Sequence, residues 1–269
     1  MRHSVALRAW LAAFAIGLGV PARTAEGPSA AEILERAFEN RYGAGIASII
    51  DLTLETKTGA TMARTIETVS TLIDGRMHSI GRLTEPPHLR GMTILSIEAD
   101  SRDHDAFLYL PSSQMVRRVS TAQRGDSFFG TDVTYGDLER QRSTDFVDLS
   151  IETISWNDEP AFAIDAYPKR STSFAKARFI VAEVDSVILV TEYFKRSTDT
   201  PFRLVEIQRD SVRAEAGHSI PTRFVVKNFS RATRTSVELR DLIVNPQIDQ
   251  SLFSIKTLSS ERRLPVGSP

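Results

Sequence analysis

Few side chains in this sequence are spaced as a catalytic or metal site would require. After the first 25 residues the histidines are His78, His88, His104 and His218, and each stands apart from any metal-ligand pattern. The sequence contains no GxSxG, Walker or GxGxxG motif. It therefore predicts no metal site, no cofactor and no enzyme activity.

Two segments resemble chemical motifs but have simpler explanations. Carboxylates gather between Glu98 and Asp105, where they could hold calcium, yet the segment lacks the glycine turn of a calcium loop and also fits a solvated hairpin tip. Ser173 and Lys176 match the S-x-x-K of serine acyl-enzymes, but the S-D-N partner motif is missing. Ser173 and Lys176 also open a predicted strand at 177–183, where an acyl-enzyme pair would need the start of a helix. We therefore interpret both the acidic segment and this pair as structural.

The first 25 residues have the composition of an export signal. Arg2 and Arg8 precede an apolar run at 9–20, and small residues occupy 22–25. This layout predicts a secretory signal peptide over residues 1–25, cleaved between 22 and 25, and the run is too short for a membrane anchor. An exported chain without cysteine is typical of a bacterial periplasm, which is the predicted location.

The composition of the chain excludes several classes of protein. The sequence has 269 residues, of which 41% are hydrophobic, and 33 basic side chains balance 34 acidic ones. Near-neutral charge argues against a nucleic-acid partner. The absence of cysteine excludes disulfides, thiol nucleophiles and a lipidated N-terminal cysteine. We expect a globular protein and interpret residues 26–269 as one domain.

One helix is predicted directly after the signal peptide. Ser29 and Glu32 form a capping box, which predicts that a helix starts at Ser29. Apolar side chains then recur at helical spacing until Gly43, with charged side chains on the opposite face. This helix must cover an apolar surface.

From Ile46 onward the hydrophobic pattern changes to strict alternation, as in residues 50–55, 147–152, 223–227 and 237–240. Alternation of this kind predicts strands with one wet face, and turn residues divide the chain into about ten of them. No strand–helix–strand rhythm appears, so an antiparallel meander is expected. A sheet this long must curl. The predicted fold is mainly β: an unclosed antiparallel barrel, capped by an N-terminal helix and short helical or loop segments.

A curled sheet of this size can enclose a cavity, and we expect the helix to close it. The candidate lining residues are apolar side chains of the helix, one strand and a loop, although an ordinary core would use the same residues: Ile33, Leu34, Ala37, Phe38, Leu52, Leu54, Phe128 and Phe129.

The stretch 127–138 pairs two aromatic residues with a glycine outside any strand period. It is either a loop that plugs one end of the sheet or a mobile rim over an apolar pocket. Five charged residues are candidates for fixing this loop by paired hydrogen bonds, unless they are unrelated surface charges: Arg90, Arg117, Arg118, Asp132 and Asp137.

Several segments resemble the LolA/LolB superfamily of outer-membrane lipoprotein-sorting proteins, in its branch associated with RND-type exporters. They are the runs at 87–92, 109–111, 116–118 and 127–138, the strand pair at 184–194 and the tail at 245–253. The resemblance implies an unclosed barrel whose hydrophobic cavity accepts acyl chains in the periplasm.

The resemblance favours a non-catalytic carrier or chaperone that binds acyl chains of lipoproteins or free lipid for transfer toward the outer membrane. The alternative is a non-transporting accessory or sensor module that docks on an envelope exporter complex. An RND-type exporter or a membrane-bound acceptor is the expected partner, and a monomer is expected. Burial of acyl chains is worth about 0.8 kcal/mol per CH₂, so a carrier needs a means of release as well as affinity.

Overall fold

The computed structural model describes residues 27–99, 104–170, 172–196, 198–260 and 262–267, so the predicted signal peptide lies outside the described residues. Helix α1 spans Ala30–Tyr42, and Ser29 caps it with the predicted capping box, in which Glu32 is the reciprocal partner. The helix ends at Gly43, as its composition predicts. No helix in the described part of the chain is long and apolar enough to cross a membrane.

Fifteen strands follow α1 in the described residues, more than the ten or so that the alternation predicts. Several of the strands have only four or five residues, too few to show a clear alternation of apolar and polar side chains. The strands are β1 (Ile46–Glu55), β2 (Thr61–Ile73), β3 (Arg76–Glu85), β4 (Thr93–Glu98), β5 (His104–Leu110), β6 (Met115–Val119), β7 (Phe146–Trp156), β8 (Glu159–Pro168), β9 (Lys176–Ala182), β10 (Ile188–Phe194), β11 (Arg203–Ile207), β12 (Val212–Glu215), β13 (His218–Pro221), β14 (Arg223–Asn228) and β15 (Thr233–Val244), with a short helix α2 (Ile255–Leu258) near the C-terminus.

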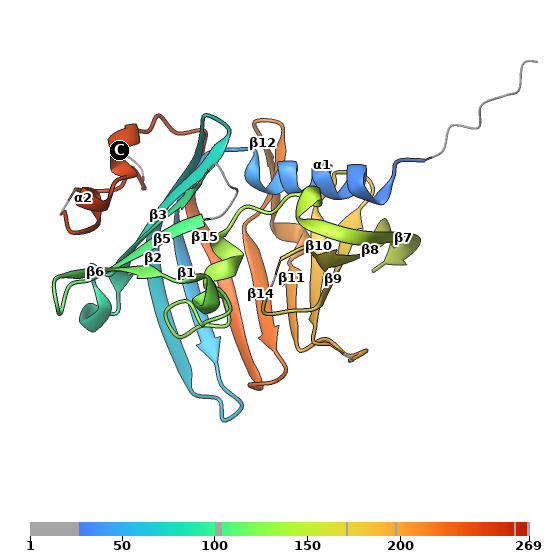
Figure 1. The fold of residues 1–269 in the computed structure, drawn as a ribbon, viewed down its shortest axis with the longest axis horizontal. Helices are drawn as coiled ribbons and strands as arrows, with labels where there is room; N and C mark the ends of the chain where they lie inside the picture. The colour runs from blue at the N-terminus through green and yellow to red at the C-terminus, as the bar shows by residue number, and fades with distance from the viewer. Residues whose placement is uncertain (1–26, 100–103, 171, 197, 261, 268–269) are drawn as a thin grey trace, which may run out of the picture.

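Thirteen of these strands form one curved antiparallel sheet, and β12 and β13 form a separate hairpin (Figure 1). The sheet order is β6-β5-β4-β3-β2-β1-β15-β14-β11-β10-β9-β8-β7. The edge strands β6 and β7 do not pair with each other, so the barrel stays open. This arrangement confirms the predicted fold class.

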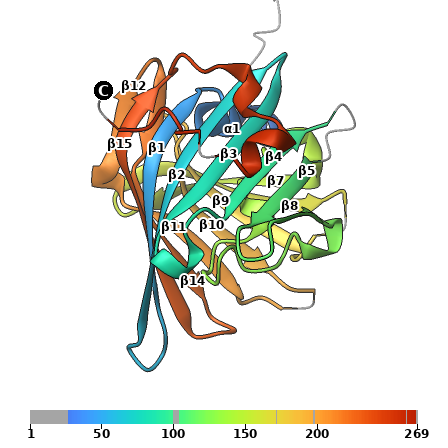
Figure 2. The same cartoon turned by 90° about the vertical axis from the view of Figure 1, so that its left-hand side faces the viewer.

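The two edge strands are consecutive among the strands of this sheet in the sequence, although the other eleven strands lie between them in the sheet. Residues 120–145, which we call the linker, must therefore pass from one edge to the other. The linker contains three short 3-10 helices but no strand, and it crosses the concave side of the sheet beside α1 (Figures 1 and 2). Its path places the aromatic loop of the sequence over the interior.

Three segments cover the sheet. On the concave side α1 packs over β7–β10, where Phe38 contacts the rings of Phe146 and Phe179. The linker covers the concave side of β1–β5, β14 and β15. The segment that follows β15 lies against the opposite face of β2–β5, where Phe253 and Leu258 are buried. The helix therefore covers one half of the interior and the linker covers the other.

One local expectation was wrong. Strand β7 has no single wet face, because it is an edge strand and leaves Val147 and Ile151 exposed as well as its polar residues. The predicted hairpin tip at 100–103 lies outside the described residues, and on either side of it Glu98 and His104 are buried at the ends of β4 and β5. Glu98 pairs with Arg142 of the linker, which explains its burial.

Candidate functional site

A cavity of about 280 Å³ lies between the concave face of the sheet and the linker. This volume is near the lower end of the range that holds small-molecule ligands. We call it the central cavity. Most of its wall is apolar and comes from strands β1–β4, β11, β14 and β15, with Ile50, Leu52, Ile66, Ile94, Val205, Phe224, Val226, Val237 and Leu239 among its lining residues.

Small side chains on the inward face of β1–β3 leave room for the cavity. Ser48, Thr68 and Ser79 line it where larger residues would fill the interior. Gly81 lies in the same wall, and a Cβ at this position would meet the Cγ2 atom of Ile66 at 3.4 Å. The alternation of the strands therefore supplies an apolar surface, and the small residues keep part of it unfilled.

The linker forms the roof of the central cavity, and Phe128 and Val133 line it from above. Asp132, which is 2% exposed, fixes the roof to β15: it accepts hydrogen bonds from Thr233 (2.6 Å) and Thr235 (3.0 Å). The backbone N–H of Asp132 also donates to Thr235 Oγ1 at 2.9 Å. Because these groups are buried, their hydrogen bonds hold the roof in one position.

A second attachment joins the linker to β11. Arg203 is 5% exposed, and its guanidinium binds both carboxylate oxygens of Asp137. Arg203 Nε also donates to the Asp132 backbone carbonyl at 3.2 Å. Asp137 in turn accepts from the backbone N–H and the hydroxyl of Thr134. This bidentate pair anchors the middle of the linker to the middle of the sheet.

The Asp137–Arg203 pair belongs to a charged cluster at one end of the central cavity, which we define as Arg41, Tyr42, Asp137, Tyr193 and Arg203. The guanidinium of Arg203 lies 4.9 Å from the ring centroid of Tyr193, and that of Arg41 lies 5.1 Å from the ring centroid of Tyr42. Burial, with the nearby carboxylate of Asp137, raises the pKa of Tyr193 to about 12, so its hydroxyl is a neutral hydrogen-bond donor at physiological pH.

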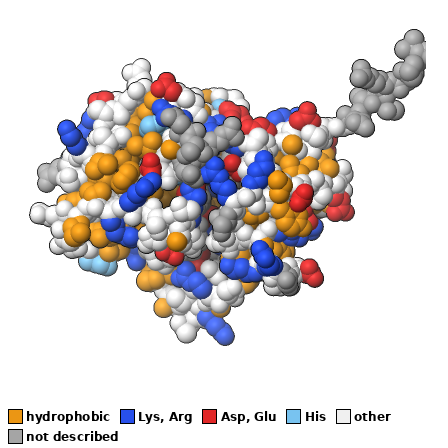
Figure 3. Space-filling view, viewed as in Figure 1, with side chains coloured by type: hydrophobic (Ala, Val, Ile, Leu, Met, Phe, Trp, Pro, Cys, Tyr) orange, Lys and Arg blue, Asp and Glu red, His pale blue; other side chains and the backbone are white. Residues whose placement is uncertain are grey.

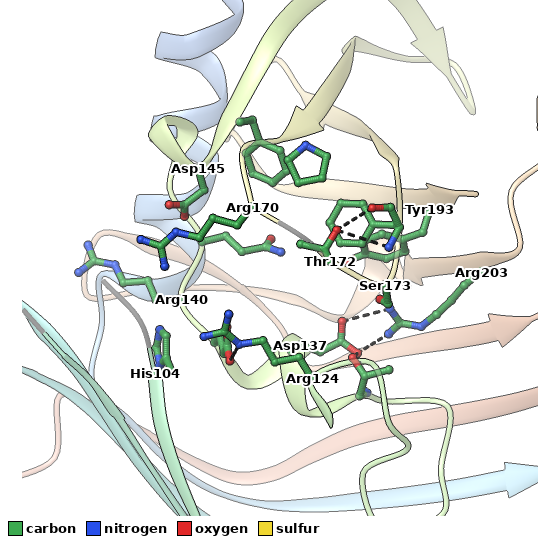
Figure 4. Close-up of a pocket in the computed structure, with 17 residues that line it drawn as sticks. His104, Arg124, Asp137, Arg140, Asp145, Arg170, Thr172, Ser173, Tyr193 and Arg203 are labelled. Atoms are coloured by element: carbon green, nitrogen blue, oxygen red, sulfur yellow. Dashed lines mark hydrogen bonds and ion pairs between the residues drawn. The ribbon is translucent and has the colours of Figure 1, made fainter. Parts of the chain in front are cut away.

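A separate polar pocket of about 120 Å³ lies beyond the cluster, and Asp137, Tyr193 and Arg203 line both spaces. Figure 4 shows Arg124, Arg140 and Arg170 around this pocket, with the Asp137–Arg203 pair at one side. Basic side chains also gather around a hollow in the middle of the face seen in Figure 3. The charged cluster thus separates an apolar interior from a polar opening.

The eight residues predicted to line the cavity lie in different places: some line a cavity and others are part of the packed core. Leu52 and Phe128 line the central cavity, and Ala37 lines a smaller cavity of about 190 Å³ beside the C-terminal half of α1. Ile33, Leu34 and Phe38 pack instead into the core between α1 and β7–β10. Phe129 contacts Phe128 in a tilted arrangement, with ring centroids 4.2 Å apart. Leu54 is buried on the same strand as Leu52 but is not part of the cavity wall.

The suggested pairing of the loop's aspartates with nearby arginines is wrong. Arg90 pairs with Glu85 at 2.7 Å, and Arg118 of β6 pairs with Asp105 of the adjacent strand β5. Arg117 is exposed on edge strand β6. The partner of Asp137 is Arg203, and Arg231 Nη1 lies 3.5 Å from Asp132. The linker bends back over the sheet, so its aspartates meet arginines that are distant in the sequence.

Sequence reasoning missed the basic members of the charged cluster. Arg41 could have been found, because it continues the buried helical stripe of Ala30, Leu34 and Ala37 at the same spacing. Arg203 gave no such signal, since its role depends on which strands are neighbours. Within the described residues, no group of three or more histidines and carboxylates is arranged to hold a metal ion.

Residues 75–260 match the sequence profile of a family described only as "uncharacterized protein". The chain belongs to this family. No curated protein sequence matches it.

Three solved structures show the same fold. A putative outer membrane lipoprotein-sorting protein domain from Vibrio parahaemolyticus has a TM-score of 0.77 at 16% identity, covering 85% of this chain and 97% of the other. A DUF1329 family protein from Desulfovibrio piger has a TM-score of 0.77 at 17% identity, with the same two coverages. A LolA superfamily protein from Nitrosomonas europaea has a TM-score of 0.68 at 19% identity, covering 86% of this chain and 99% of the other. The resemblance inferred from the sequence is therefore confirmed at the level of the fold.

Proposed function

We propose that this protein is a non-catalytic carrier that binds an acyl chain of a lipoprotein or lipid in its central cavity. The observation that carries the proposal is the apolar cavity itself, which is built into the concave face of a lipoprotein-sorting fold and roofed by the linker. An interior made only for stability would be filled by side chains. Here small residues on β1–β3 leave it open.

The energy available from such a site suits a carrier. Each buried methylene contributes about 0.8 kcal/mol, so about ten methylenes would contribute about 8 kcal/mol before ordering costs. Without those costs this value would correspond to a Kd near the micromolar range, so the net affinity is weaker than micromolar. The cargo is therefore held against dilution in water but can still be passed to an acceptor that buries more of the chain.

The remaining expectations belong to the same proposal. Residues 1–25 direct the chain to the periplasm and are removed there, and residues 26–269 form one domain that acts as a monomer. The carrier moves its cargo toward the outer membrane, and an RND-type exporter or a membrane-bound acceptor is its partner. No nucleic acid and no cofactor takes part.

A docking module is the alternative function. Edge strand β7 favours it, since Val147 and Ile151 are exposed there and Tyr167 is exposed on β8. An exposed apolar edge of this kind can contact another envelope protein. The central cavity has no role in this alternative, so cavity mutations separate the two functions.

The experiment is a titration of the mature protein with a fluorescent fatty acid. Ser79→Trp places a large side chain in the cavity wall, whereas Thr53→Trp places the same side chain at an exposed position of β1. We expect saturable binding by the wild type and by Thr53→Trp, and at least tenfold weaker binding by Ser79→Trp. Equal binding by both variants, with both folded, would show that the chain binds elsewhere. Absence of binding by the wild type would favour the docking module.

A further inference from the structure

We propose that the cargo carries an anionic head group and that Arg41 binds it at the end of the central cavity. The inference rests on the proposed function, because it names the class of amphiphile that the same cavity takes. A carboxylate or phosphate group would lie in the charged cluster while the acyl chain lies along the apolar wall.

Arg41 faces the interior although its side chain is accessible. It follows Ala37 and Phe38 by four and three residues, so it lies on the buried face of α1. It lines both the central cavity and the smaller cavity beside the helix. Arg41 therefore contributes to the walls of both cavities.

The charges around Arg41 do not balance. Asp137 is the only carboxylate that lines the central cavity in the described residues, and both of its oxygens bind Arg203. Among the residues that the structure describes, no carboxylate lies within ion-pair distance of Arg41. Two arginines and one aspartate leave an excess of one positive charge.

Nearby acidic residues do not remove this excess, because other arginines hold them. Glu139 pairs with Arg124 at 2.7 Å, and Glu39 pairs with Arg140 at 3.3 Å. A guanidinium without a carboxylate partner keeps its hydrogen-bond donors available, and a carboxylate or phosphate can accept from them in a paired geometry. The positive charge of Arg41, which has no carboxylate partner among the described residues, therefore favours a ligand with an anionic group.

Two further features place a head group at this point. The Tyr42 ring lies 5.1 Å from the Arg41 guanidinium, and Tyr193 lines the same cavity. Burial raises the pKa of both tyrosines, so both hydroxyl groups are neutral. Three members of the cluster, Asp137, Tyr193 and Arg203, also line the polar pocket (Figure 4), so the cluster lies between a polar space and the apolar space that would hold the chain. This is the geometry that an amphiphile requires.

The test compares decanoate with decanol, which have the same chain length and differ in head-group charge, as competitors of the fluorescent fatty acid. Hydrogen bonds between two charged groups are stronger than those to a neutral hydroxyl, so the wild type should bind decanoate at least about tenfold more tightly than decanol. Arg41→Gln should lose this preference while still binding decanol, and Arg41→Lys should keep part of it. Arg36→Gln removes the same charge from the exposed face of α1 and should behave as the wild type.

Thermal unfolding of each variant verifies that it is folded. If the wild type binds both competitors equally, or if Arg41→Gln keeps the preference, the head-group inference is wrong and the carrier proposal stands. If the wild type binds neither competitor, the carrier proposal itself is wrong.

Extraction of lipid from the wild type and Arg41→Gln identifies the source of the anion. Fatty acid and phosphatidylglycerol are the two anionic outcomes, and either supports the inference. Recovery of only neutral or zwitterionic lipid from the wild type would overturn it.

Discussion

Replacing Asp137 with Asn should release the linker from β11 and destabilise the protein strongly. The side chain of Arg203 is 6% exposed and that of Asp137 is 17% exposed, so the pair is largely buried. Breaking one partner of such a pair leaves an uncompensated buried charge, which costs about 3–5 kcal/mol. Because Asp137 keeps some contact with solvent, we expect the lower end, about 3 kcal/mol.

The matched control is Asp105→Asn, which also breaks a pair between an arginine and an aspartate. The side chains of Arg118 and Asp105 are 68% and 39% exposed, so this change should cost less than about 1 kcal/mol. Urea unfolding measures both free energies. In thermal unfolding, about 3 kcal/mol corresponds to a Tm lower by about 6–12 °C for a chain of this size. If the two variants lose the same stability, the Asp137–Arg203 pair does not anchor the linker.

Three further changes test other parts of the structure. Ser29→Ala should lower the free energy of unfolding by about 1 kcal/mol in urea titrations, because it removes the N-cap of α1, and an unchanged midpoint would contradict the capping role. Phe38→Ala should cost about 3–5 kcal/mol by the same method, since it empties a core position that is 2% exposed, and a cost near that of Ser29→Ala would show that this core is loosely packed. Burial and nearby Arg76 lower the pKa of His78 below its ordinary 6.5, so its contribution to stability is full above pH 6.5 and is lost as the pH falls toward the folded-state pKa. Unfolding of the wild type between pH 7.5 and 5.5 should therefore show a larger loss of stability than unfolding of His78→Phe, and equal losses would exclude His78 as the titrating group.

Local features of the fold could be predicted because the determining residues are neighbours in the chain. The capping box identified the start of α1, and the alternation around Leu52 and Leu54 placed both residues on the inward face of β1. Turn residues at Thr58–Gly59 and Asp74–Gly75 lie between consecutive strands, in keeping with the division of the chain by turn residues. In each case only a few consecutive residues determine the structure.

The candidate site depends on residues that are far apart in the sequence, so less of it could be predicted. Asp137 and Arg203 meet because the linker crosses from β6 to β7 and β11 lies in the middle of the sheet. Strand order and register determine such contacts, and neither can be read from alternation alone. Sequence reasoning therefore assigned the nearest arginines to the aspartates. Arg41 was overlooked because a charge was expected to lie on the wet face of the helix.

The central claim is that the cavity holds an acyl chain in the cell. The most direct measurement is organic extraction and mass spectrometry of the protein purified from a periplasmic fraction, with Ser79→Trp and Thr53→Trp prepared in parallel. We predict lipid or an acylated lipoprotein in stoichiometric amount with the wild type and Thr53→Trp, and little with Ser79→Trp. A wild-type protein that carries no lipid, or a Ser79→Trp variant that carries as much as the wild type, would contradict the claim.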